Sequence, residues 1–307
     1  MLLLIKYTLL YGIVLMLVAL GGMFSEHSGV INIALEGIMV VGGLAGVLVT
    51  ASMPTTMAPA LIVLAAVVAA AVCGMLYSLL LAFASINLKA DQTIGGTALN
   101  MLATAIAMIL AKNFNGSTSA KISYTNKPFL FSIGGLELSI FIPLGIVLLV
   151  VSYIVMYKTR FGLRLRACGE HPQAADSVGI NVYKMRYAGV LISGVLGGVG
   201  GLAYTLAAGS GFNSDVGGYG FLALAVMIFG NWKPLPILAA SLFFALFKVI
   251  AALNSTLTFL PMFEGVKEIS NFYQMLPYIV TMIVLIFTSK NSQAPKAEGI
   301  PYDKGSR

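Results

Sequence analysis

Long apolar runs alternate with short polar stretches along almost the whole chain. The runs lie near residues 8–23, 37–52, 58–84, 92–111, 138–157, 187–207, 235–253 and 272–288, with a shorter one at 219–231. A helix needs about 17–25 apolar residues to cross a hydrocarbon core of about 30 Å. The pattern therefore predicts an all-α polytopic membrane protein with about nine transmembrane helices. We expect a transmembrane domain at residues 1–288 and a polar, disordered cytoplasmic tail at residues 289–307.

Composition agrees with a lipid environment and charge sets the orientation. Of the 307 residues, 59% are hydrophobic and only 9% are charged, whereas soluble domains carry about 25% charged residues. The net charge of +7 does not indicate nucleic acid, because the bases lie at the ends of apolar runs. Residues 158–186, the basic segment, hold six Lys or Arg. With this segment inside, twelve bases face the cytoplasm and five the outside, which predicts an outer N-terminus and an inner C-terminus in the plasma membrane.

Several function classes lose support because their motifs are absent from the sequence. The first apolar run could be a secretory signal, but no A-x-A-like site follows it, so we expect a retained helix. The chain has no G-x-x-x-x-G-K-[ST] phosphate loop and no H-E-x-x-H motif, and His27 and His171 stand alone. We therefore expect no catalytic residue, no metal and no cofactor. The remaining classes are a transporter, a channel and a membrane scaffold.

Two Gly-containing polar stretches interrupt the helical pattern at membrane depth, at residues 25–37 and 209–221. Irregular backbone is tolerated there only where it is buried in protein or lines a watery cavity. A pair of such breaks in the two halves of a transporter indicates its substrate site. The sequence thus predicts a translocation pathway with five candidate residues: Asn32, Glu36, Asn100, Asn213 and Tyr219.

Structural roles compete with this interpretation at several polar positions. Glu36 fits equally well as an acid at the N-terminus of the following helix, where the helix dipole favours a negative charge. Asn100 fits an interhelical hydrogen bond. Asp215 is expected in a solvated outer loop, and Lys248 is expected to extend its ammonium to the outer interface.

The middle of the basic segment predicts a short cytoplasmic helix at about residues 171–178. Pro172 suits the first helical position, Ala174 and Ala175 favour helix, and Gly179 suits a left-handed C-terminal cap. Its body is small and mildly polar and lacks the Trp, Phe or Leu face of an interfacial membrane helix. This helix therefore suits a groove in another protein better than lipid.

Three motifs in order resemble those of one family of permeases. They are "SGVINIALEGIMVVGG" near the start, "GLRLRACGEHPQAADSVGIN" in the basic segment and "GYGFLALAVMIFGNWKP" near the end. Together they resemble the permeases of ABC importers for simple sugars, branched-chain amino acids and nucleosides, from about Leu10 to Phe287. "NIALEG" and "ALAVMIFGNWKP" resemble the nucleoside branch, which works with basic membrane lipoproteins. One departure is His171, since the branch has Asn there and His is the weaker N-cap.

The resemblance implies a vitamin B12 importer-like (type II) permease fold and an ATP-driven import mechanism. Its implied partners are an ABC nucleotide-binding (ATPase) subunit, a second permease subunit that is commonly a different paralogous chain, an extracytoplasmic substrate-binding lipoprotein and membrane lipid. It also implies that the short helix couples to the ATPase through Gly169, Glu170, His171, Pro172, Ala174, Ala175, Asp176 and Gly179. The alternatives are the same machine carrying a simple sugar or a branched-chain amino acid, and an ion-coupled secondary transporter, for which Glu36 and Asp215 are thin support.

Overall fold

The computed structural model describes residues 2–54, 56–116, 119–133, 136–209, 211–253 and 293–305, together with six positions between 275 and 286. Within that part, seven helices are long and apolar enough to cross a membrane. They are α1 (Leu2–Glu26), α2 (Leu35–Ser52), α3 (Pro59–Ala82), α4 (Gln92–Phe114), α5 (Phe141–Lys158), α8 (Val182–Ala208) and α10 (Pro234–Ala252). A shorter apolar helix, α9 (Tyr219–Phe229), lies between α8 and α10. The polytopic helical prediction is confirmed, whereas the expected span at 272–288 lies mostly outside the described residues.

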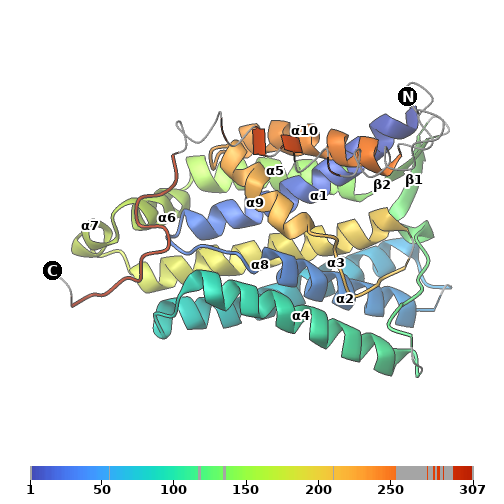
Figure 1. Ribbon diagram of the computed structural model, residues 1–307, viewed down its shortest axis with the longest axis horizontal. Coiled ribbons are helices and arrows are strands. Elements are labelled where there is room, and N and C mark those ends of the chain that lie inside the picture. The colour runs from blue at the N-terminus through green and yellow to red at the C-terminus, as the bar shows by residue number, and fades with distance from the viewer. Residues whose placement is uncertain are drawn as a thin grey trace.

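The long helices run side by side, and the polar elements collect at the two ends of the bundle (Figure 1). At one end, called the hairpin end, lie the 3₁₀ turn η2 (Lys127–Phe129) and the antiparallel strands β1 (Leu130–Ile133) and β2 (Leu136–Ser139). At the opposite end, called the α7 end, lie α6 (Arg160–Glu170), α7 (Pro172–Ser177) and a π-helical turn, η1 (Phe83–Asn87). The N-terminus is at the hairpin end and the C-terminus at the α7 end (Figure 1).

Helices α1 and α8 form the centre of the bundle. Side chains of α1 from Val14 to Leu20 are fully buried, because α8, α9 and α10 pack around this helix. Glycines on α8 allow α2 and α3 to approach it backbone to backbone. A methyl group on Gly198 would overlap the carbonyl oxygen of Ala70, and one on Gly201 would overlap that of Met39. Small residues replace large side chains at such contacts because apolar side chains gain little from leaving lipid.

The basic segment contains more helix than the sequence analysis predicts. Arg160, Arg164 and Arg166 lie on α6, which Thr159 caps by accepting a hydrogen bond from the Gly162 amide at 3.2 Å. Helix α7 occupies the predicted position, with Pro172 in its first turn and Gly179 at a φ of +83° just after it.

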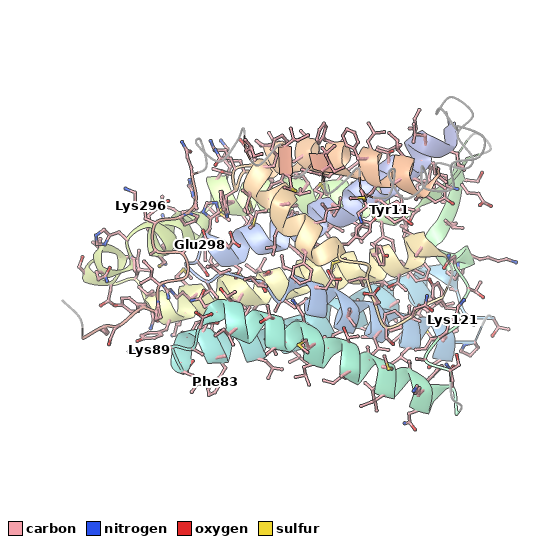
Figure 2. All side chains as sticks on the ribbon, in the orientation of Figure 1. Tyr11, Phe83, Lys89, Lys121, Lys296 and Glu298 are labelled. Carbon is pink, nitrogen blue, oxygen red and sulfur yellow. The ribbon has the colours of Figure 1, made fainter. Side chains whose placement is uncertain are left out.

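The expectation of a disordered tail is wrong for residues 293–305. This stretch lies along α6, α7 and the start of α8 (Figure 1). Backbone hydrogen bonds join Ala297 to Gly169 and Gly299 to Gly29, and Tyr302 is buried. The low hydropathy of the tail does not predict its order, because hydrogen bonds and the buried Tyr302 side chain hold it in place instead of an apolar run. Figure 2 shows Lys296 and Glu298 at the α7 end, opposite Tyr11 and Lys121.

Candidate functional site

Helices α2 and α9 both begin in the middle of the bundle instead of at its ends. After α1, the chain runs in non-helical form from the α7 end to the middle, and α2 continues to the hairpin end (Figure 1). After α8, residues 211–218 return from the hairpin end to the middle, and α9 continues toward the α7 end (Figure 1). Gly217 and Gly218 make the second turn possible, with φ of +62° and +76°. The two predicted breaks are thus inverted counterparts whose helix N-termini meet.

Glu36 joins these two helix starts. It lies in the first turn of α2, and its carboxylate accepts hydrogen bonds from the amides of Gly218 at 2.8 Å and Gly220 at 2.6 Å. Its side chain is buried, and a Cβ on Gly220 would lie 2.5 Å from the Glu36 Cα, so the backbones are in contact. A carboxylate at this point satisfies unpaired amides and faces the positive ends of two helix dipoles. Glu36 does lie in the first turn of α2, as the cap interpretation requires, but no side-chain hydrogen bond caps α2. The amides that its carboxylate satisfies are those at the start of α9, 182 residues away.

Asn32 and Asn100 hold the non-helical stretch that precedes α2. The Asn32 amide donates to the Ser193 hydroxyl at 2.8 Å. The Asn100 side chain accepts from the Gly37 amide at 2.7 Å and donates to the Ile33 carbonyl at 2.9 Å. Backbone groups in such a stretch lack helical partners, so buried side-chain amides supply them. The interhelical hydrogen bond expected for Asn100 is confirmed.

A cluster of three tyrosines lies between α1, α8 and the start of α9. The ring centroids of Tyr204 and Tyr219 are 4.6 Å apart, and that of Tyr11 lies 5.6 Å from Tyr219 and 6.3 Å from Tyr204. The Lys248 ammonium lies 5.3 Å from the Tyr219 ring centroid, so it extends over an aromatic face. The sequence analysis selected Tyr219 and missed the other two. Their only sequence signal is a phenol within an apolar run.

A small cavity adjoins this cluster on the side of the hairpin end. Its volume is about 110 Å³, and it is lined by Tyr204, Thr205, Ala208, Gly211, Phe212, Asn213 and Asp215. The Asp215 carboxylate accepts a hydrogen bond from the Gly217 amide at 3.1 Å, and the side chain is exposed, as expected for an outer loop. A β-bridge joins Phe212, one of the lining residues, to Ile122. Asn213 and Tyr219 therefore lie near one hollow, whereas Asn32, Glu36 and Asn100 lie around the helix starts.

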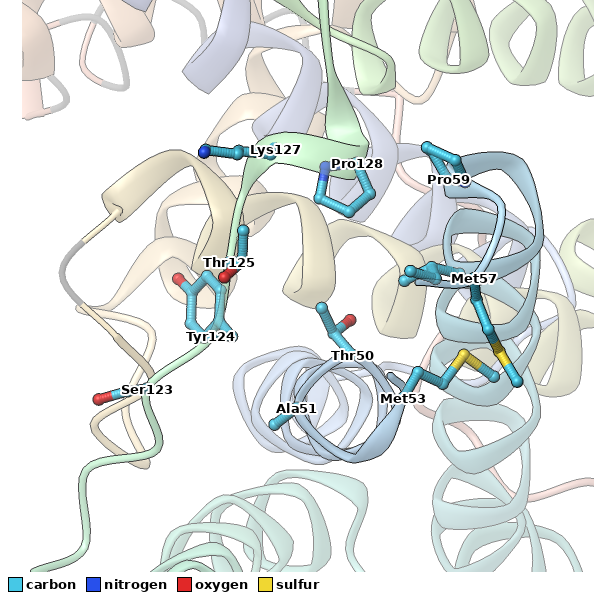
Figure 3. A pocket seen from close by; sticks show the side chains of 11 residues that line it. Thr50, Ala51, Met53, Met57, Pro59, Ser123, Tyr124, Thr125, Lys127 and Pro128 are labelled. Carbon is cyan, nitrogen blue, oxygen red and sulfur yellow. The ribbon is translucent and has the colours of Figure 1, made fainter. Parts of the chain in front are cut away.

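A larger cavity of about 590 Å³ opens at the hairpin end, between the α2–α3 connection and residues 123–128 (Figure 3). Its wall combines apolar side chains from one side with hydroxyl-bearing side chains from the other. The residues that line it are Thr50, Ala51, Met53, Met57, Pro59, Ile62, Ser123, Tyr124, Thr125, Lys127 and Pro128. Burial raises the pKa of Tyr124 to about 12, so this phenol stays protonated and donates to the Thr205 carbonyl next to the tyrosine cluster.

At the α7 end, the short helix is fixed by its cap and by its neighbours. The His171 Nδ1 accepts from the Ala174 amide at 3.3 Å, a long bond that agrees with histidine being the weaker cap. Ala175 is buried, while Glu170, His171 and Ala174 are exposed. Gly169 has no room for a side chain, because a methyl there would overlap the His27 carbonyl oxygen. The helix therefore has an inner face that is packed and an outer face that is open.

Residues 4–288 match the family described as the permease component of the branched-chain amino acid transport system. The chain belongs to this permease family. A nucleoside ABC transporter permease protein, NupC of Lactococcus lactis, is 43% identical, with 96% of this chain and 95% of that one covered. A guanosine ABC transporter permease protein, NupQ of Bacillus subtilis, is 42% identical, with 98% and 96% covered. A putative glucose ABC transporter permease protein of Haloferax volcanii is 31% identical, with 80% and 75% covered.

The predicted coupling residues of the permease, Gly169 to Gly179, lie together at one end of the bundle. The predicted pathway residues separate into two groups. Asn32, Glu36 and Asn100 form the contacts that hold α2 and α9 in place. Asn213 lines the hollow, and Tyr219 belongs to the tyrosine cluster beside it. The sequence of the permease indicates which segments are irregular, but the pairing of one break with the other is visible only in the structure.

Proposed function

We propose that the chain is the permease subunit of an ATP-driven importer that carries nucleosides across the plasma membrane. The observation that carries this proposal is its identity of 43% and 42%, over nearly full length, to permeases named for nucleosides and for guanosine. The structure supports it with a hollow that Tyr204 lines beside the tyrosine cluster. Aromatic rings suit a nucleobase, since base–aromatic stacking contributes about 1–3 kcal/mol per base.

In this proposal, the hollow makes the first contacts with substrate inside the membrane. The base stacks on Tyr204, and Asn213 and Asp215 hydrogen-bond the ribose hydroxyls and the base edge. Tyr11 and Tyr219 pack beside Tyr204 and hold its ring in position. Asn32, Glu36 and Asn100 act as positioning residues, because they hold the two helix starts that a change of access must move.

The basic segment couples this pathway to ATP hydrolysis. Closure of the ATPase subunits displaces α7 through residues 169–179. Helix α6 links α7 to α5, and α7 leads directly into α8. Because α8 contacts α1, α2 and α3, its displacement reaches the junction of α2 and α9. A rigid short helix tethered to two spans supplies the two-state element that coupling requires.

The proposed assembly contains two permease subunits, two ATPase subunits and an extracytoplasmic binding lipoprotein in a type II arrangement. A nucleoside permease of Lactococcus lactis named NupB is 32% identical over 113 residues, 35% of this chain. That match supports a paralogous second permease. We place the hairpin end outside and the α7 end in the cytoplasm, because the basic segment lies on α6, on α7 and at the start of α8.

Uptake of labelled guanosine, adenosine and uridine, with ribose, glucose and leucine as controls, tests the proposal in cells with and without the gene. We expect loss of nucleoside uptake alone. Loss of ribose, glucose or leucine uptake would support an ATP-driven importer but contradict nucleosides as its substrate. Nucleoside uptake that survives ATP depletion but not an ionophore would instead indicate an ion-coupled secondary transporter.

Tyr204→Ala and Tyr204→Phe test the hollow within the same assay. We expect Tyr204→Ala to raise the KM for guanosine about tenfold or more, as loss of a stacking surface would, while Tyr204→Phe keeps it within about twofold. Tyr77, whose hydroxyl bonds the Leu99 carbonyl away from the hollow, gives the matched control Tyr77→Ala. Equal losses at Tyr204 and Tyr77 would contradict a role in binding.

A further inference from the structure

Residues 293–305, called the tail from here on, connect segments that are far apart in the sequence. Its contacts with the other described segments include six hydrogen bonds or ion pairs. They join Gln293 to Asn231 (2.8 Å), Ala297 to Gly169 (2.8 Å), Gly299 to Gly29 (3.3 Å), Ile300 to Arg186 (2.9 Å), Asp303 to Lys89 (2.9 Å) and Lys304 to Asp176 (3.8 Å). Four of these involve a backbone group of the tail, so they depend on its path more than on its side chains. The tail therefore bridges the α1–α2 and α9–α10 connections to α6, α7 and α8.

Two buried groups fix the position of the tail. Tyr302 is only 4% exposed and packs with Cys168, Ala175 and Val182. Arg186, at the start of α8, is 1% exposed, and its Nη1 donates to the Ile300 carbonyl. Among the described residues, its Nε and Nη2 have no hydrogen-bond partner. Because a buried guanidinium is costly without acceptors, the tail carbonyl stabilises the start of α8.

The outer face of the tail continues the open face of the basic segment. Ile300 is 57% exposed, Val178 at the end of α7 is 75% exposed and Leu163 on α6 is 63% exposed. These side chains lie at the α7 end of the bundle, which the proposed topology places outside the lipid. Exposed bases accompany them: Arg164, Lys184, Lys296 and Lys304. Apolar side chains among bases at one end of a membrane protein indicate a protein partner that is apolar at the contact and acidic at its rim.

We propose that the tail and α7 together form the surface on which the ATPase subunit docks. This inference rests on the proposed function, since it requires that the chain works with such a subunit. The partner it fits has a groove with an apolar floor and acidic edges. In this arrangement, the ATPase pushes on α7 and the tail at once, so displacement reaches α8 through Arg186 and the α1–α2 connection through Gly29.

Substitution of an exposed tail side chain tests the docking surface with little risk to folding. Ile300 contacts Arg186 through its backbone carbonyl, so Ile300→Asp keeps that hydrogen bond and changes only the exposed side chain. The matched control is Met57→Asp, which changes an exposed apolar side chain at the hairpin end. The assay is recovery of the co-expressed nucleotide-binding subunit on the tagged, full-length permease in detergent, quantified by ATPase activity.

We expect Ile300→Asp to lower recovery of the ATPase subunit about tenfold and Met57→Asp to leave it unchanged. Recovery with Ile300→Asp equal to that of the unmodified chain would overturn the inference. Equal losses in the two variants would overturn it as well, because the effect would not be local to the tail. If the unmodified chain recovers no ATPase subunit, the proposed function itself fails.

A second pair of variants separates docking from the packing of the tail. Tyr302→Ala removes the buried anchor, whereas Tyr302→Phe keeps the ring in its place against Tyr183, 5.4 Å away. We expect Tyr302→Ala to reduce ATPase recovery and nucleoside uptake at least fivefold, and Tyr302→Phe to restore both to within twofold. Equal effects of Tyr302→Ala on recovery of the second permease subunit would show general unfolding and contradict the proposal.

Discussion

Replacement of Glu36 by glutamine tests the junction of the two helix starts. Its carboxylate accepts a partly buried hydrogen bond from the Gly218 amide at 2.8 Å and a buried one from the Gly220 amide at 2.6 Å. Hydrogen bonds to a charged acceptor contribute about 1.5–3 kcal/mol each. Glutamine keeps one acceptor oxygen but turns an NH₂ group toward the other amide, which leaves that buried donor unpaired. The neutral side chain also loses its interaction with the two helix dipoles.

We therefore expect Glu36→Gln to lower the free energy of unfolding by about 2–3 kcal/mol. For a chain of this size, that corresponds to a decrease in Tm of about 4–10 °C. Glu36→Asp keeps the charge but is one methylene shorter, so it reaches only one amide and gives an intermediate decrease. Thermal unfolding of the purified permease in detergent, followed by size-exclusion chromatography after heating, measures the shift.

The matched control is Glu137→Gln, on the exposed side of β2 at the hairpin end. It makes the same chemical change outside the junction and leaves the Tm within about 1 °C, as is usual for exposed sites. If Glu36→Gln also leaves the Tm unchanged, the carboxylate does not stabilise the α9 start, and the reasoning fails. Transport offers an independent readout, because Glu36→Gln is expected to lower nucleoside uptake beyond its effect on the amount of folded protein.

Three further outcomes are expected. His171→Asn strengthens the α7 cap by about 0.5–1 kcal/mol, and slower hydrogen exchange at the Ala174 amide would confirm it, whereas unchanged exchange would contradict it. Burial raises the pKa of Glu298, so the packed tail is favoured while this acid is protonated. Packing of the tail therefore weakens as the pH rises from the pKa of a free glutamate through the raised pKa of Glu298. Glu298→Gln is expected to remove this pH dependence, which hydrogen exchange of the tail at several pH values measures. Gly198→Val overlaps the Ala70 carbonyl and is expected to abolish accumulation of folded permease, whereas Gly95→Val, at an open position on α4, is tolerated.

Hydrophobic patterning predicts the local helices well because each span satisfies its own backbone hydrogen bonds and needs only an apolar surface. It predicts the α7 helix too, because Pro172 and Gly179 have local conformational preferences. It misses α6, in which bases alternate with apolar residues over only eleven positions. Because α6 is too polar for a membrane span, a search for apolar runs does not find this helix.

Contacts between segments that are far apart in the chain could not be predicted from the sequence. Glu36 could be identified as a helix cap, but its partner helix is 182 residues away. Tyr11 and Tyr204 come together only because α1 and α8 pack at the centre of the bundle. The tail has the composition of a disordered segment, and its order depends on acceptors and donors supplied by several other segments.

The Arg186–Ile300 hydrogen bond has a consequence for the order of events during synthesis. The guanidinium enters the fold with α8, whereas its carbonyl partner is made 114 residues later. At translation rates of about 5–20 residues per second, that separation lasts several seconds. During this interval the start of α8 holds a cation without its final acceptor, and Tyr302 has not yet covered Cys168. The α7 end is therefore completed last, so a chain truncated during translation cannot present the finished surface to another subunit.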